Sequence, residues 1–157
     1  MNCIDWYGAK EYCEWIGWRL PTEEEWEYAS THNGTEHLDT TYPWGNDAPT
    51  HCVTAQYYDS STSKHCQGNA AAPMTNGGYE GTSDVSLHSP AGESPLHLVD
   101  LSGNVWEWTT SLYSSDSSAY TVKGGSWDFN LNNLGVTWRL SNYPTYGDGM
   151  GGFRCAK

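Results

Sequence analysis

The sequence has few basic residues, few phenylalanines and no long apolar run. Its 7 Lys and Arg stand against 19 Asp and Glu, which gives a formal net charge of -12. Because binding to a nucleic-acid backbone needs clustered Lys and Arg, we expect no nucleic-acid partner. The charge favours small cations, although solubility alone also accounts for it. No apolar run approaches membrane-spanning length, and residues 1–20 lack the basic-then-apolar order of a signal peptide, so we expect no membrane insertion.

The sequence also lacks the motifs of several common chemistries. No Cys-x-x-Cys pair, Gly-x-Ser-x-Gly elbow, P-loop, His-x-x-x-His or His-x-His spacing occurs in it. A structural zinc site, a serine hydrolase elbow and a phosphate-binding loop are therefore not predicted.

Five cysteines occur without zinc-site spacing, so disulfides in an oxidising compartment are the better interpretation. Cys52 and Cys66 can close a small loop by a disulfide within a loop-rich stretch that needs a covalent cross-link to be ordered. The odd count leaves one thiol over, and Cys3, near the start of the chain, is the candidate.

The composition is instead rich in Trp, Tyr and Gly. Nine Trp and 11 Tyr occur with only 2 Phe and 17 Gly. Indole and phenol groups need hydrogen-bond partners when buried, so we expect an aromatic core with polar edges. A length of 157 residues fits a single domain over residues 1–157.

Two helices are predicted near the start of the chain. Asp5 can cap a helix with apolar residues at helical spacing that ends at Gly17. Thr22 stands three residues before Glu25, which is a capping box, and acids fill the first turn of a helix ending near Ser30.

The rest of the chain predicts long loops and a small antiparallel sheet. Residues 42–97 are rich in turn-forming types and show no sustained period. Alternating or β-prone segments predict strands at 104–109, 119–127, 136–139 and 152–156. Two helices followed by such a sheet make an α+β domain.

Several segments together resemble the formylglycine-generating enzyme, or sulfatase-modifying factor, family, whose fold is an elaborated C-type lectin fold. They occur in the family's order and cover nearly the whole chain, but the N-terminal third of the family domain has no counterpart. The segments are the Asp-Trp to Glu-Tyr stretch at 5–28, Tyr-Pro-Trp-Gly at 42–45, Leu-Ser-Gly-Asn-Val-Trp-Glu-Trp at 101–108, Gly-Gly-Ser-Trp at 124–127 and Gly-Phe-Arg-Cys-Ala at 152–156.

The resemblance implies a disulfide but not the family's copper chemistry. It pairs Cys13 with Cys155, the alternative being two buried free thiols. The enzyme's copper-binding cysteine pair has no counterpart, since Phe129 takes the first place and no cysteine lies between Cys66 and Cys155. Thiolate ligation of copper is thus missing there, and we expect neither copper nor iron.

The resemblance also implies a structural calcium ion. The set combines two carboxylate side chains with two backbone carbonyls, the hard oxygen ligands that Ca²⁺ prefers. Its members are Asp100, Gly103, Val105 and Glu107. The alternative is that Asp100 caps a turn and that Glu107 pairs with Arg139 or Arg154.

The C-terminal segment has the composition of a recognition surface, with large aromatics beside adaptable polar groups. We expect Trp106, Trp108 and Trp127 to form core or pocket wall. The predicted contacts are Asp128, Phe129, Asn130, Asn132, Asn133, Trp138, Leu140, Asn142, Tyr143, Thr145, Tyr146 and Asp148.

This segment further resembles that of the variable proteins of diversity-generating retroelements, which end in a variable stretch closed by Gly-Phe-Arg. Adenine-specific mutagenesis of Asn codons reaches most of its residue types, although not Trp138 or Met150. An ordinary Asn-rich loop over the same scaffold is the alternative.

The sequence thus predicts a non-catalytic ligand-binding domain on a rigid scaffold, with a protein or cell-surface ligand and an extracellular, cell-surface or virion-surface location. The first alternative is an oxidoreductase of the same superfamily acting on a thiol or peptide. The second is a structural module of a larger surface assembly. Neither the ligand nor the oligomeric state follows from the sequence.

Overall fold

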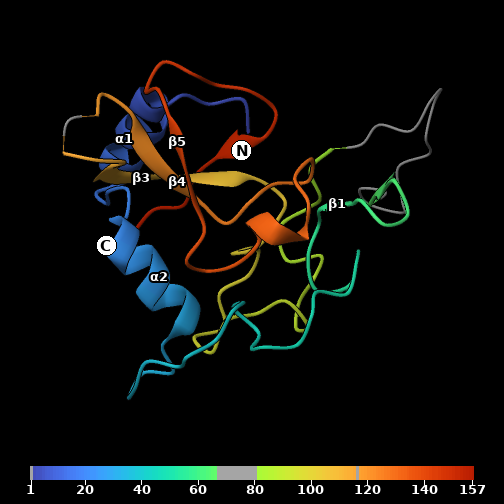
Figure 1. Cartoon of the computed structure of the whole chain (residues 1–157). Coiled ribbons are helices and arrows are strands. Elements are labelled where there is room, and N and C mark those ends of the chain that lie inside the picture. Colours follow the sequence, from blue (N-terminus) through green and yellow to red (C-terminus); the bar gives the residue numbers. More distant parts are fainter. Residues whose placement is uncertain (1, 67–80, 116) are drawn as a thin grey trace.

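A computed structural model describes residues 2–66, 81–115 and 117–157 (Figure 1). It is an α+β fold of two helices, a curled four-stranded sheet and long loops, as the sequence predicted, and it adds a short β-ribbon within residues 42–97, where only loops were expected. The elements are α1 (Trp6–Trp15), α2 (Glu23–Thr31), β1 (Tyr58–Asp59), β2 (Lys64–His65), β3 (Trp106–Leu112), β4 (Tyr120–Lys123), the 3-10 helix η1 (Leu131–Asn133), β5 (Arg139–Asn142) and β6 (Gly151–Gly152).

Both helices begin at the caps that the sequence predicted. The Asp5 side chain accepts a hydrogen bond of 2.9 Å from the backbone N–H of Gly8 at the start of α1. At α2, Thr22 accepts from the Glu25 N–H at 3.1 Å, and the Glu25 carboxylate accepts from the Thr22 N–H at 2.9 Å. This reciprocal pair satisfies two N–H groups that a helix start leaves without partners.

The main sheet has the strand order β5-β4-β3-β6 and is mixed rather than antiparallel. β4 runs antiparallel to both β3 and β5, but β6 pairs with β3 in parallel, with Trp106 opposite Gly151. The prediction of a wholly antiparallel sheet was wrong at this edge. Residues 143–150 carry the chain from β5 across the sheet, so β6 enters in the same direction as β3.

Three strand predictions were also wrong in extent. The expected strand at 119–127 ends at Lys123, because Gly124 and Gly125 take φ angles of 92° and 79°, outside the extended range. The expected strand at 136–139 is a turn up to Trp138, and β5 begins only at Arg139. The C-terminal strand expected at 152–156 is reduced to the two residues of β6.

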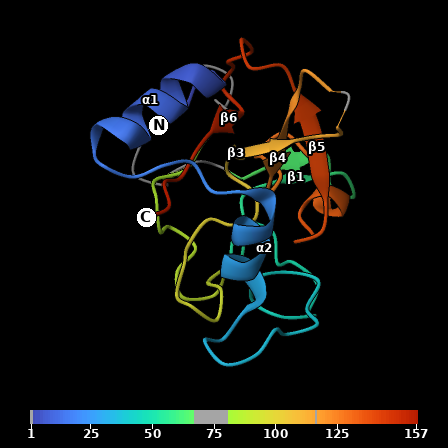
Figure 2. The same cartoon turned by 90° about the vertical axis from the view of Figure 1, so that its left-hand side faces the viewer.

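The two helices pack on opposite faces of the main sheet (Figure 2). On one face, Trp106, Trp108 and Val122 join Trp6 and Cys13 of α1 in a buried cluster. On the other face, Glu107 reaches Trp26 of α2. Alternation along β3 thus sends its tryptophans towards α1 and its carboxylate towards α2.

Two disulfides cross-link segments of the chain that are distant in the sequence or separated by a loop. Cys13 of α1 is bonded to Cys155, and Cys52 is bonded to Cys66, as predicted. Cys3 is free and exposed, which confirms it as the leftover thiol. No helix in the described ranges is both long and apolar enough to cross a membrane.

Candidate functional site

The C-terminal segment builds one side of a cavity of about 230 Å³ on the α1 face of the sheet. Residues of β3 and β4 form its floor, while β5 and the loop that follows it form its wall. The lining residues are Trp106, Trp108, Val122, Phe129, Leu140, Ser141, Asn142, Tyr146, Asp148, Met150 and Gly151.

The floor of this cavity is buried and aromatic. Trp106 and Trp108 lie two residues apart in β3 and are 5% and 1% exposed. The Trp108 indole donates a hydrogen bond of 3.1 Å to the Ile4 carbonyl, and the Trp106 ring meets Phe129 edge-on at 5.2 Å. Their predicted role as core and wall agrees with this placement.

The loop over the cavity is fixed by its own hydrogen bonds. The Asp148 carboxylate accepts from the N–H groups of Met150 and Gly151 at 2.9 and 3.0 Å. The Trp127 indole, which is half-buried, donates to the Gly149 carbonyl at 3.2 Å. A hydrogen bond with Asp148 raises the pKa of Tyr146 above its ordinary value, so this phenol stays neutral at the cavity mouth.

Five of the twelve predicted contact residues line the cavity: Phe129, Leu140, Asn142, Tyr146 and Asp148. The other seven lie outside it: Asp128, Asn130, Asn132, Asn133, Trp138, Tyr143 and Thr145. All twelve are at least partly exposed, with Tyr143 at 64% and Trp138 at 45%.

Some of the residues outside the cavity make contacts that stabilise the C-terminal segment itself. The Asn130 side chain caps η1 by accepting from the Asn132 N–H at 3.0 Å. One Asp128 oxygen lies 3.7 Å from Nε2 of His65. These contacts hold the segment in shape and leave its outer face open.

Sequence reasoning missed four lining residues, Val122, Ser141, Met150 and Gly151. Ser141 lies on β5 between two predicted contacts, and because β5 is an edge strand with both faces accessible, alternation did not identify its orientation. Met150 reaches the cavity because its carbonyl accepts a hydrogen bond of 2.7 Å from the Trp106 N–H. No periodic pattern in the sequence signals that contact.

Three of the four predicted calcium ligands, Asp100, Val105 and Glu107, line a second cavity of about 260 Å³ on the other side of β3, and Gly103 is not among its lining residues. One Asp100 oxygen accepts from the Ser86 N–H at 2.8 Å. The other, Oδ1, is buried and has no hydrogen-bond partner among the described residues. That oxygen fits a cation.

Glu107 fits a cation less well, because both its oxygens already have donors. Arg154 holds it by two hydrogen bonds of 2.6 Å, and the Trp26 indole donates a third at 2.6 Å. The pairing with Arg154 is one of the alternatives that the sequence left open. The calcium site stays a prediction.

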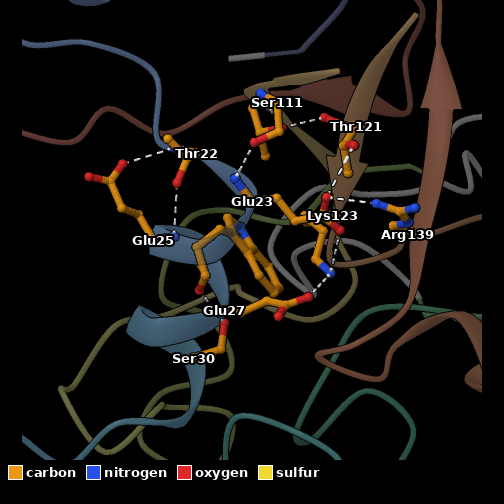
Figure 3. Close-up of polar contacts among 11 residues, drawn as sticks. Thr22, Glu23, Glu25, Glu27, Ser30, Ser111, Thr121, Lys123 and Arg139 are labelled. Atoms are coloured by element: carbon orange, nitrogen blue, oxygen red, sulfur yellow. Dashed lines mark hydrogen bonds and ion pairs between the residues drawn. The ribbon is translucent and has the colours of Figure 1, made fainter. Parts of the chain in front are cut away.

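An ion-pair network on the α2 side supports the strands that carry the cavity (Figure 3). Lys123 of β4 is fully buried and lies 2.7 Å from Glu27 and 3.6 Å from Glu23. Glu23 also accepts from Arg139 of β5 at 2.9 Å and from the Thr121 hydroxyl at 3.3 Å. These contacts join β4 and β5 to α2, so the strands that form the floor and wall of the cavity are held in position from their other face.

Comparison with known proteins agrees with this architecture. The structure resembles variable protein 1 of Treponema denticola, with a TM-score of 0.59 and 24% identity over 87% of this chain and 46% of that one. It also resembles PvdO from Pseudomonas aeruginosa, with a TM-score of 0.66 and 19% identity over 97% of this chain and 59% of that one. At these identities the likeness establishes the fold, which is C-type-lectin-like.

Sequence relatives define the family. Inactive C-alpha-formylglycine-generating enzyme 2 of Bos taurus is 36% identical over 160 residues, which cover 98% of this chain and 48% of that protein. Formylglycine-generating enzyme of Thermomonospora curvata is 31% identical over 175 residues, covering 98% and 54%. The chain therefore spans about half the length of these relatives. Because residues 1–157 match the sulfatase-modifying factor enzyme 1-like domain throughout, the chain belongs to the formylglycine-generating enzyme family.

Proposed function

We propose that this domain is a non-catalytic binding module that presents its C-terminal segment to a protein or cell-surface ligand. The observation that carries the proposal is the cavity in which five predicted contact residues meet two buried tryptophans. A relative named as inactive is in keeping with a loss of catalysis. Two disulfides suit an extracellular, cell-surface or virion-surface location.

The cavity fits a small apolar group flanked by polar atoms. Trp108 and Leu140 offer apolar walls, while Asn142, Asp148 and Tyr146 offer hydrogen-bonding groups at its edge. Mostly apolar pockets with a few placed polar groups are typical of binding sites. Because the loop is already held by hydrogen bonds, little ordering free energy is lost when a ligand binds.

A peptide library displayed on phage provides a test that needs no known ligand. Peptides selected on the wild-type domain are compared on Tyr146→Ala and on the matched control Tyr7→Ala. Both tyrosines are 50% exposed, but only Tyr146 lines the cavity. We expect Tyr146→Ala to weaken binding by at least about tenfold and Tyr7→Ala to leave it unchanged. Equal binding to both variants would place the recognition surface elsewhere.

Structural calcium belongs to the same proposal. Asp100 would hold the ion by its free oxygen, the carbonyls of Gly103 and Val105 would add ligands, and Glu107 would share an oxygen that Arg154 now occupies. Metal content by mass spectrometry and melting with chelator test this. Calcium at 100 times its dissociation constant stabilises by about 2.7 kcal/mol, or roughly 5–10 °C in a domain of this size. An unchanged melt in chelator would remove calcium from the proposal.

Diversification by a retroelement is a finer part of the proposal. It rests on the Asn-rich composition of residues 128–148 and predicts where sequences differ between isolates. Sequencing the coding region from independent isolates should show changes confined to adenine positions of that segment. Changes spread evenly along the gene would favour an ordinary loop.

An oxidoreductase acting on a thiol or peptide is the alternative, favoured by the 31% identity with a formylglycine-generating enzyme. It requires a metal site other than the copper thiolates of the family. Stoichiometric copper or iron in purified protein, together with aldehyde formation on a cysteine-containing peptide, would establish it in place of the binding module.

A further inference from the structure

A group of metal-ligand side chains lies in the loop region, outside both cavities described above. It consists of His51, Cys52 and Cys66, each offering one ligand atom, and these three atoms all lie within 4.8 Å of one another. Cys52 is exposed, His51 is half-buried and Cys66 is buried. In the structure the two cysteines are joined as a disulfide.

The orientation of His51 is that of a metal-binding histidine. Its Nε2 lies 3.0 Å from the Tyr57 carbonyl oxygen. A carbonyl only accepts, so Nε2 carries the hydrogen and Nδ1 keeps a lone pair. Nδ1 lies 3.4 Å from the Cys52 sulfur. Histidine ligands almost always donate their other ring N–H to such a partner, which fixes both the tautomer and the ring.

Backbone contacts independent of the disulfide hold the cysteines in place. The Cys52 N–H donates to the Ala55 carbonyl at 3.2 Å. Cys66 directly follows β2, which pairs with β1 by placing His65 opposite Tyr58. The Tyr58 N–H in turn donates to the Phe129 carbonyl at 2.9 Å. We therefore expect the backbones of the two cysteines to stay close when the bond between their sulfurs is broken.

We propose that His51, Cys52 and Cys66 bind a zinc ion when this disulfide is reduced. A dithiol reductant supplies two electrons and two protons and itself becomes a disulfide, leaving two free thiols. Zinc then displaces the thiol protons and is held by two thiolates and the neutral Nδ1, with a fourth position open to water. Thiolate and imidazole are the ligands that zinc prefers.

The fold brings this site together where sequence spacing did not indicate it. The two cysteines are 14 residues apart, and the β1–β2 ribbon between them returns the chain to its starting point. The same loop is thus closed by a disulfide under oxidising conditions and by zinc under reducing ones. This exchange does not depend on what the C-terminal cavity binds.

The test compares zinc binding by the oxidised and the mildly reduced protein. Both are prepared in a Cys3→Ser background, because the exposed Cys3 thiol would otherwise bind zinc on its own. Cys13 is fully buried and Cys155 half-buried, whereas Cys52 is exposed, so we expect the reductant to open the bond between Cys52 and Cys66 first. Mass spectrometry after alkylation counts the two thiols released. Zinc is titrated in competition with a chromophoric chelator, and cobalt substitution reports thiolate ligands by absorbance.

We expect one zinc per chain in the reduced protein and none in the oxidised protein. His51→Ala should weaken binding by at least about tenfold, since even changes to partners of a ligand cost 10–100-fold. Cys52→Ser should weaken it further. His97→Ala is the matched control, because the His97 side chain is 86% exposed and lies outside the group.

Three results would overturn the proposal: equal zinc uptake by the oxidised protein, unchanged affinity in both His51→Ala and Cys52→Ser, or no uptake by the reduced protein. If reduction alone abolishes the near-ultraviolet circular dichroism, zinc must restore it for the proposal to stand. A failure of zinc to restore that signal counts against the site.

Discussion

Replacing Lys123 by methionine tests the ion-pair network behind the candidate cavity. Lys123 is fully buried between α2 and the sheet and lies 5.5 Å from the centre of the Trp26 ring. Methionine nearly matches the lysine side chain in volume, so Lys123→Met removes the charge without leaving a large cavity. The change therefore isolates the electrostatic contribution of the ammonium group.

The magnitude follows from what each carboxylate retains. Removing one partner of a buried ion pair typically costs about 3–5 kcal/mol. Glu23 keeps Arg139 at 2.9 Å, and the Glu27 side chain is 38% exposed and regains water. We therefore expect the lower end, about 3 kcal/mol, which corresponds to a fall of roughly 6–12 °C in the melting temperature.

The assay is urea unfolding at neutral pH followed by tryptophan fluorescence, with calorimetric melting as a second measurement. Lys10→Met is the matched control, because Lys10 pairs with Glu14 on the surface of α1 with both side chains at least 40% exposed. We expect that change to cost about 0.5 kcal/mol or less. A loss below about 1 kcal/mol for Lys123→Met would refute the view that this network anchors the sheet.

Three further predictions concern a glycine and two titrating groups. Gly103→Ala should lower the free energy of unfolding by about 3 kcal/mol or more, because φ is +77° and the added Cβ would lie 2.2 Å from a backbone carbonyl oxygen. The control Gly34→Ala, where the added Cβ meets open space, should lower it by about 1 kcal/mol. Thermal melts of both variants measure the difference. A hydrogen bond from Arg19 lowers the pKa of Glu25 to about 2, so the stabilisation that the ionised Glu25 gives the fold is present above about pH 4.5 and is lost as pH falls towards 2. The melting temperatures of wild type and Glu25→Gln should therefore converge between about pH 4.5 and 2. Burial lowers the pKa of His88 below 6.5, so the folded protein loses stability as pH falls below that value. In His88→Gln the melting temperature should therefore depend less on pH between about pH 7 and 5.

Local chemistry made the helices predictable. Asp5 and the pair Thr22 and Glu25 act on N–H groups within three residues, so their effect is visible in the sequence itself. The error at β5 has a tertiary cause. Val136 looked like a strand residue, but from a turn it packs into a buried cluster with Trp26 and Leu101.

The candidate site was predictable in composition but not in geometry. The aromatic and Asn-rich character of the C-terminal segment marked it as exposed, and all twelve predicted residues are accessible. Which five of them share a cavity depends on the path of residues 143–150 between β5 and β6. For Glu107, sequence alone left calcium and arginine open, and only the fold shows Arg154 at 2.6 Å.

The bond between Cys13 and Cys155 turns most of the domain into a covalent ring, since it joins residues 142 positions apart. By the chain-entropy relation, closing a ring of that size stabilises the fold by about 5 kcal/mol. A protease that cuts inside the ring, for example at Val85, which is 72% exposed, would open it without releasing either piece. Such a nicked domain would keep its full mass until a reductant is added, so its exposed loops can be cut while α1 and the C-terminal segment stay tethered.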